Sequence, residues 1–172
     1  MMNTQVGADE RAKWAKFRGG ALFEHGCHLN DPLIRLMGRP TKITSTLQRT
    51  GAFPDALADN CVAVYEFDHA VGILSNTPLQ PNAGAHRFFE IIGTAGTARV
   101  EPLEQPILHL DLPKATGPYA AGRQDITFAP YARYVDEFAA LAKSIRDGSP
   151  LPVGAAEELV IQEALLRACR ML

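Results

Sequence analysis

Seven short runs rich in β-branched and aromatic residues occupy the middle of this chain, and they constrain its fold more than any other feature. They cover residues 42–48, 61–67, 71–77, 86–92, 97–101, 107–112 and 125–128. Runs of this length and composition are typical of β-strands. Asp68-His69 and Ala95-Gly96 are the expected turns between neighbours, and such short connections cannot hold a parallel crossover, which needs about a dozen residues. The pattern therefore predicts a mainly antiparallel sheet.

Helical periodicity is present on both sides of this central region. Asp9 is the expected N-cap of the first helix. Pro32 interrupts the second segment, so we expect a break there, with Asp31 capping a further short helix that has Pro32 at its first position. Four helical segments are expected in all, at residues 9–17, 21–37, 130–147 and 155–171.

The predicted strands are apolar on both faces. Val62 and Val64 point to one side while Tyr65 points to the other, and Phe88 similarly opposes Phe89. Such a sheet needs two covering layers, and the few helices can supply only one. We therefore expect an α+β fold: an open, mostly antiparallel sheet with helices packed on one face. The other face is expected to be an oligomer interface, against a second copy or against a missing part of the protein.

The length and the net charge of the chain exclude some classes of function. The chain has 172 residues, with 17 basic against 19 acidic side chains and a formal net charge of −2. This size suits one domain, expected over residues 19–172 after a leader and short helix at 1–18. The near-neutral balance predicts no nucleic-acid partner, and no apolar run reaches the roughly 18–20 residues of a membrane helix.

The cysteines and the absence of known motifs indicate the compartment and exclude further classes of function. The three cysteines are scattered, and no signal-like segment opens the sequence, so we expect a cytoplasmic protein. No Gly-x-Gly-x-x-Gly fingerprint, P-loop or Gly-x-Ser-x-Gly elbow is present. No bound cofactor is therefore expected for this chain alone.

The densest group of chemically capable side chains lies at residues 24–31. On a helix, Glu24 and His28 are one turn apart and share a face, which Asp31 would join if the helix continued. A carboxylate beside an imidazole orients the ring and favours its protonated form, which suits a general acid–base. Glu24, His28 and Asp31 are therefore the candidate catalytic residues.

Other interpretations remain open at this point. The same group could be a polar helix end, or a metal site using Glu24, His28 and Asp31, or His25 with His28. No second Cys or His cluster completes a coordination shell, so no metal ligand is assigned. Cys27 is interpreted as a packing residue. His69 is expected in a turn, and His86 and His109 in strands.

Four stretches, in order, resemble a known family. Residues 19–31 resemble the motif GG-x-x-x-[D/E]-x-G-x-H-x-x-D, which opens the C-terminal domain of the glucose–fructose oxidoreductase, inositol dehydrogenase and MocA family. Residues 59–67 with 71–74 look like its central hairpin. Residues 89–98 resemble its E-I-x-G-T-x-G-T segment, and residues 138–152 its F-x-x-x-I-x-x-G-x-x-P helix and stop. The resemblance covers residues 15–172.

The resemblance implies a domain organisation and a role for each motif residue. Family members pair an N-terminal Rossmann domain, which binds NAD or NADP, with an α+β domain whose bare sheet face commonly forms the subunit interface. The motif histidine acts as acid–base or orients substrate near the nicotinamide, supported by the motif's acidic residue. By resemblance these are His28 and Glu24, and the final Asp is Asp31.

The sequence also departs from the family pattern. The nucleotide fingerprint and the Glu-Lys-Pro motif with its catalytic lysine are missing, Glu24 stands where many members have Asp, and His25 and Pro32 are unusual. The chief hypothesis is the substrate-binding and oligomerisation domain of an NAD(P)-dependent oxidoreductase for a sugar, polyol or related compound. The chain is then either a truncated or fragmentary member or one whose Rossmann domain is encoded separately. One alternative is a dimerisation or small-ligand-binding module without catalysis, and a lesser one is a metal-dependent hydrolase or isomerase.

Overall fold

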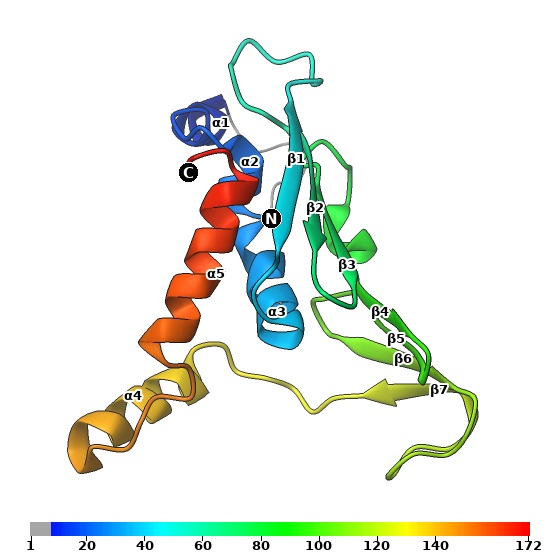
Figure 1. The fold of residues 1–172 in the computed structure, drawn as a ribbon. Helices are drawn as coiled ribbons and strands as arrows, with labels where there is room; N and C mark the ends of the chain where they lie inside the picture. The colour runs from blue at the N-terminus through cyan, green and yellow to red at the C-terminus, as the bar shows by residue number, and fades with distance from the viewer. Residues whose placement is uncertain (1–7) are drawn as a thin grey trace. The chain divides into compact units, whose positions relative to one another are not determined.

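The computed structural model describes residues 8–172, and its elements follow the expected order (Figure 1). Helices and strands both occur, and every strand pairing among these residues is antiparallel. The helices are α1 (Ala8–Trp14), α2 (Gly20–Glu24), α3 (Cys27–Met37), η1 (Ala83–His86), α4 (Val135–Asp147) and α5 (Ala155–Ala168). The strands are β1 (Lys42–Gln48), β2 (Asn60–Glu66), β3 (Val71–Asn76), β4 (Phe89–Gly93), β5 (Gly96–Val100), β6 (Ile107–Leu112) and β7 (Gly122–Thr127).

The strands form two sheets where the sequence suggested one. One sheet has the order β1-β2-β3, and the other has the order β4-β5-β6-β7. Contacts within the chain divide it into two compact units, residues 81–133 and the remainder. The α+β class and the open antiparallel sheets are as predicted. The single domain over residues 19–172 stays a prediction, and most of the expected leader lies outside the described residues.

Unit 1 has helices on one face of its three-stranded sheet. Burial alternates along β2, where Cys61, Ala63 and Tyr65 are fully buried and their neighbours are not. Helices α2, α3 and α5 pack on this buried face. On the opposite face Val71 and Ile73 are 65% and 72% exposed. The helices therefore cover one face only, as the sequence indicated.

The N-terminal helices differ from expectation in where they begin and end. The expected break at Asp31-Pro32 is wrong, because α3 runs through both residues and Pro32 lies inside it. The break falls instead at His25-Gly26. Asp31 is therefore no N-cap. Asp9 is no N-cap either, because it lies within the first turn of α1.

Unit 2 is a four-stranded antiparallel sheet with one polar and one apolar face. A cross-strand row of Glu90, Arg99, His109 and Asp125 lies on the polar face. The next row, on the other face, holds the side chains of Phe89, Val100, Leu108 and Ile126. The prediction of two apolar faces is therefore wrong for this sheet. The guanidinium of Arg99 lies 3.8 Å from the ring centre of Phe88, which places that aromatic side chain on the polar face.

The last two helices are shorter than predicted, and they differ in burial. Helix α4 begins at Val135, five residues after the predicted start, and none of its residues is buried. Phe138 and Ile145 are 67% and 77% exposed. Helix α5 buries Ile161, Ala164, Leu165 and Ala168. None of the helices among the described residues is both long enough and apolar enough to cross a membrane.

Candidate functional site

The predicted site lies where α2 gives way to α3. Helix α2 ends at Glu24, and the N–H of His25 donates to the Ala21 carbonyl over 2.9 Å. His25 and Gly26 both keep right-handed helical dihedrals, so the chain makes one irregular turn before α3. A Cβ on Gly26 would lie 2.4 Å from the Leu22 carbonyl oxygen. Only glycine fits this close approach, which explains a glycine at this position.

The structure brings Glu24 and His28 within one turn but leaves them unbonded. His28 is the second residue of α3 and is exposed, while Glu24 is half-buried. Within residues 8–172, neither side chain takes part in a hydrogen bond or ion pair. Catalytic hydrogen bonds often form only when substrate binds, so this geometry is compatible with the predicted pair.

Asp31 is engaged elsewhere. Its carboxylate accepts from Arg35 Nε at 2.9 and 3.0 Å, one turn further along α3. Arg35 also pairs with Glu158 over 3.0 Å and with Glu157 over 3.6 Å, both in the first turn of α5. Asp31 is therefore part of a surface network that joins α3 to α5, and it does not complete a triad with Glu24 and His28.

The two residues between Glu24 and His28 that carry polar side chains have packing roles. The His25 ring contacts Trp14 of α1 edge to face, with ring centres 4.4 Å apart. The Cys27 thiol donates to the Glu24 carbonyl over 3.3 Å. Burial raises the pKa of the Cys27 thiol, and the nearby carboxylates of Glu24 and Asp31 add to the effect. This thiol therefore stays protonated and is no nucleophile.

A buried polar anchor fixes the orientation of α3. Asn30 is fully buried, and its Nδ2 donates to the Ile161 carbonyl over 2.9 Å. The Tyr65 hydroxyl donates to Asn30 Oδ1 over 3.0 Å. These bonds join α3 to α5 and to β2. This anchor cannot be predicted from the sequence, because nothing local distinguishes a buried asparagine from an exposed one.

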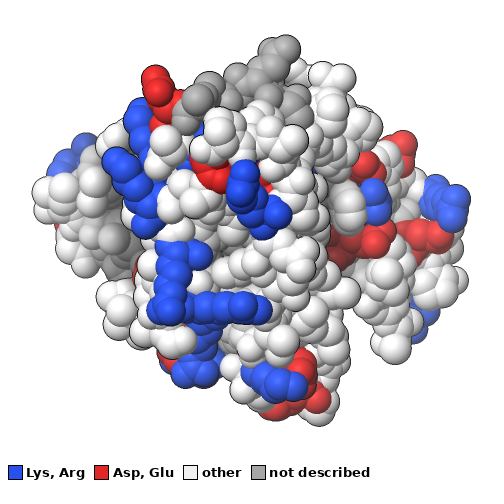
Figure 2. Space-filling view, turned by 90° about the horizontal axis from the view of Figure 1, so that it is seen from above, with Lys and Arg blue, Asp and Glu red and all other residues white. Residues whose placement is uncertain are grey.

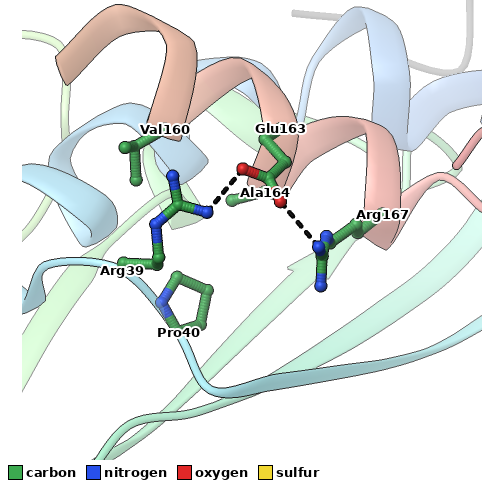
Figure 3. A pocket seen from close by; sticks show the side chains of 6 residues that line it. All are labelled: Arg39, Pro40, Val160, Glu163, Ala164 and Arg167. Atoms are coloured by element: carbon green, nitrogen blue, oxygen red, sulfur yellow. Dashed lines mark hydrogen bonds and ion pairs between the residues drawn. The ribbon is translucent and has the colours of Figure 1, made fainter. Parts of the chain in front are cut away.

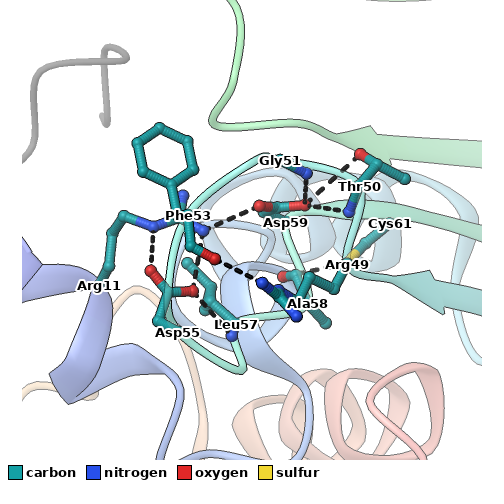
Figure 4. A network of polar contacts seen from close by, with 10 residues as sticks. All are labelled: Arg11, Arg49, Thr50, Gly51, Phe53, Asp55, Leu57, Ala58, Asp59 and Cys61. Atoms are coloured by element: carbon teal, nitrogen blue, oxygen red, sulfur yellow. Dashed lines mark hydrogen bonds and ion pairs between the residues drawn. The ribbon is translucent and has the colours of Figure 1, made fainter.

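A second buried network holds α1 in place (Figure 4). The guanidinium of Arg11 pairs with Asp55 and with Asp59, and its Nη2 lies 2.8 Å from the nearer Asp59 oxygen. The other Asp59 oxygen accepts from the N–H groups of Thr50 and Gly51, at 2.8 and 3.2 Å. Arg11 lies one turn before Trp14 on α1. The network therefore supports the helix on which the His25 ring rests.

Charge is unevenly distributed around this part of unit 1. Lys13, Lys16, Arg18 and Arg170 are all exposed, and Gly19 lies against Cys169 at the end of α5. Figure 2 shows basic side chains gathered over part of the face that is seen from above. The net charge of −2 thus conceals a locally basic surface beside the motif.

The other histidines named from the sequence lie on other elements of the chain. His69 is exposed in the turn between β2 and β3, and His86 is exposed at the end of η1 instead of in a strand. His109 lies in β6, where its Nδ1 is 2.7 Å from Asp125 Oδ1, and this hydrogen bond raises the pKa of the imidazole. Across residues 8–172 no group of three or more His, Cys, Asp or Glu side chains could hold a metal ion. The metal-site alternative therefore has no support here.

The described residues do not fit a dinucleotide. Such cofactors are bound by parallel strands joined by a helix, with a glycine-rich turn at the helix N-terminus. Both sheets in residues 8–172 are antiparallel throughout. The site can offer an imidazole and a carboxylate to a ligand, but it holds no cradle for a nicotinamide cofactor.

Comparison with known proteins adds the family context. The sequence profile of the GFO/IDH/MocA C-terminal domain matches residues 2–99, more than half of the chain. None of the curated proteins matches.

Solved structures share the fold. UDP-N-acetylglucosamine 3-dehydrogenase from Acidithiobacillus ferrooxidans is 17% identical with a TM-score of 0.65, over 85% of this chain and 44% of its own. An oxidoreductase from Agrobacterium radiobacter, in complex with NAD+, L-tartaric acid and magnesium, is 15% identical with a TM-score of 0.68, over 86% and 45%. A protein from Desulfitobacterium hafniense, named as an NADPH-dependent oxidoreductase, is 17% identical with a TM-score of 0.65, over 90% and 46%. The chain thus spans about half the length of these neighbours.

Proposed function

This chain belongs to the GFO/IDH/MocA family and carries its C-terminal domain, and from that premise we propose that it is the substrate-binding half of an NAD(P)-dependent oxidoreductase. The proposed substrates are sugars, polyols or related hydroxyl compounds. Its neighbours of known structure are oxidoreductases, among them one bound to NAD+ and one named as NADPH-dependent. Since the described residues hold no dinucleotide cradle, we propose that a Rossmann domain outside these residues carries the cofactor.

The observation that carries the proposal is the exposed imidazole of His28 at the start of α3, one irregular turn from Glu24. A ring nitrogen of His28 would accept the proton that a substrate hydroxyl loses on oxidation. Glu24 would orient the ring and stabilise the resulting imidazolium. The cofactor would supply the hydride chemistry from the other half of the enzyme.

We further propose that the open face of the β1-β2-β3 sheet forms a homo-oligomer interface. Val71 and Ile73 project from this face and are mostly exposed, whereas soluble monomers rarely leave adjacent β-branched side chains bare on one sheet. Substituting Ile73→Lys should lower the oligomer mass in light scattering. The matched variant His69→Lys adds a charge in the nearby turn and should leave the mass unchanged. A monomeric parent chain would refute the proposal.

The same exposed face also favours the second candidate, a module that dimerises or binds a small ligand without catalysis. The two candidates predict different behaviour of His28. In a non-catalytic module His28 is a surface residue whose replacement has no effect on ligand binding. In the substrate-binding half of an oxidoreductase it contacts the hydroxyl compound.

A titration followed by NMR separates these candidates. Labelled protein is titrated with myo-inositol, glucose and N-acetylglucosamine, and the backbone shifts of residues 20–31 are followed. We expect saturable shifts with at least one compound, lost in His28→Ala and kept in His69→Ala, which removes an exposed histidine elsewhere. If none of the compounds shifts these residues, or if both variants behave alike, the catalytic interpretation fails.

A further inference from the structure

A small pocket lies at the other end of α3 from His28. It has a volume of about 20 Å³ and lies between the segment after α3 and the exposed side of α5 (Figure 3). Its lining residues are Arg39, Pro40, Val160, Glu163, Ala164 and Arg167. Along the axis of α3 it lies roughly 14 Å from His28, at 1.5 Å per residue. The pocket is therefore independent of the site proposed above.

Glu163 holds two guanidinium groups on either side of one carboxylate. Arg39 Nη1 lies 2.5 Å from Glu163 Oε2, and Arg167 Nη2 lies 2.6 Å from Glu163 Oε1. Both arginine side chains are more than half exposed, at 59% and 54%. The hydrogen bond from Arg39, with the charges of both arginines, lowers the pKa of Glu163, so its carboxylate stays ionised at neutral pH. The arginines are thus fixed side by side with their outer edges open.

The donors that remain determine what the pocket can bind. An arginine carries five N–H donors, and these ion pairs engage only one nitrogen of each guanidinium. The pocket has one carboxylate for two guanidiniums and keeps a net charge of +1. The network of Arg35 with Asp31, Glu157 and Glu158 lies further toward the N-terminus of α5 and is net acidic, so we expect binding to be weak.

We propose that Arg39 and Arg167 form a binding site for the phosphate group of a small ligand, with Glu163 as the carboxylate that pairs with both guanidiniums and competes with the phosphate for them. A phosphate group carries more negative charge and more acceptor oxygens than a carboxylate, and it can accept from two guanidiniums through different oxygens. Pro40, Val160 and Ala164 form the apolar part of the lining, and the small volume excludes a whole dinucleotide.

Titration of the chain with inorganic phosphate at constant ionic strength tests the site. We expect saturable NMR shifts centred on Arg39 and Arg167. Arg39→Gln and Arg167→Gln should each weaken phosphate binding by about threefold or more, because each loses a unit charge at close range. Glu163→Gln should tighten it by about threefold for the same reason, an effect that a loss of fold cannot produce.

One control variant and one control anion accompany the phosphate titration. Arg123→Gln removes an exposed arginine from β7 in the other unit and should leave phosphate binding unchanged. Acetate at the same ionic strength should bind more weakly than phosphate. The proposal is overturned if phosphate fails to saturate, if Arg39→Gln matches Arg123→Gln, if Glu163→Gln weakens binding, or if acetate binds as tightly as phosphate. None of these readouts depends on His28 or on oxidoreductase activity.

Discussion

Substituting Asp59→Ala removes one acidic partner from the buried Arg11 network. Asp59 is fully buried and Arg11 is only 2% exposed, so water can replace little of what is lost. Arg11 keeps its pair with Asp55. The N–H groups of Thr50 and Gly51 lose their carboxylate acceptor altogether. The variant therefore has an underpaired guanidinium and two unsatisfied donors.

The free energy of unfolding should fall by about 3 kcal/mol. Breaking a buried pair by removing one partner costs about 3–5 kcal/mol, and we take roughly half of the lower figure because Asp55 remains. Each lost hydrogen bond to a backbone N–H adds about 1 kcal/mol. For a chain of this size the melting temperature should drop by roughly 6–12 °C.

Low pH should remove the stabilisation that the ionised carboxylates of Asp59 and Asp55 provide. Burial pushes the pKa of Asp59 upward, but hydrogen bonds from Thr50, Arg11 and Gly51 outweigh it and hold the pKa below its ordinary 3.8. Asp55 is likewise lowered, chiefly by its hydrogen bond from Arg11. A lowered folded-state pKa contributes stability that is present above pH 3.8 and is lost as the pH falls through the folded value. Asp59→Ala should therefore flatten the acid limb of the stability curve.

Urea unfolding followed by Trp14 fluorescence measures the effect close to the network. Trp14 is the only tryptophan and packs against Leu57 in the core. Asp68→Ala, in an exposed turn, is the matched control and should cost almost nothing. In a double-mutant cycle with Arg11→Met, the combined loss should fall short of the sum by about 2 kcal/mol. Additive losses, or a loss below about 1 kcal/mol for Asp59→Ala, would refute the reasoning.

Two further predictions concern unit 2 and the packing around the motif. The hydrogen bond to Asp125 raises the pKa of His109, so this bond stabilises the fold below pH 6.5 and its contribution is lost as the pH rises through the pKa of His109 in the folded state. Asp125→Asn should lower the pKa of His109 toward 6.5 in an NMR titration. An unchanged titration curve contradicts this prediction. Gly19→Ala should lower the free energy of unfolding by about 1–3 kcal/mol, because the new Cβ would lie 2.5 Å from the Cys169 sulfur. Gly154→Ala is the matched control, since its Cβ meets nothing within 4 Å. It should lower the free energy of unfolding far less in the same urea assay.

Local pattern predicts all seven strands, but the bounds of two differ most: the run 86–92 corresponds to β4 at Phe89–Gly93, and the run 125–128 corresponds to β7 at Gly122–Thr127. The predicted runs 42–48 and 107–112 coincide with β1 and β6. The break in the N-terminal helices falls at His25-Gly26 and not at Pro32, so glycine is the stronger signal here. Pro32 lies five residues after the start of α3, where it removes only the N–H that would pair with the His28 carbonyl. Gly26, by contrast, allows a close approach to the Leu22 carbonyl that no other residue could make.

The polar core could not be predicted in the same way. Arg11 contacts Asp55 and Asp59, which lie 44 and 48 residues further along the chain. Sequence rules place charged residues at the surface, and only the tertiary fold shows that these three satisfy one another. The same holds for the pairs of Arg35 with Glu157 and Glu158, which depend on α5 lying beside α3.

The exposure of His28 follows from the burial of Asn30. Successive residues of an α-helix are turned by about 100°, so side chains two positions apart project roughly 200° apart. Tyr65 and Ile161 hold Asn30 against the sheet and α5, and this fixes the rotation of α3 about its own axis. The imidazole at position 28 must then point away from the core. An anchor that serves stability therefore also determines whether the proposed acid–base residue can reach a substrate, although it touches neither.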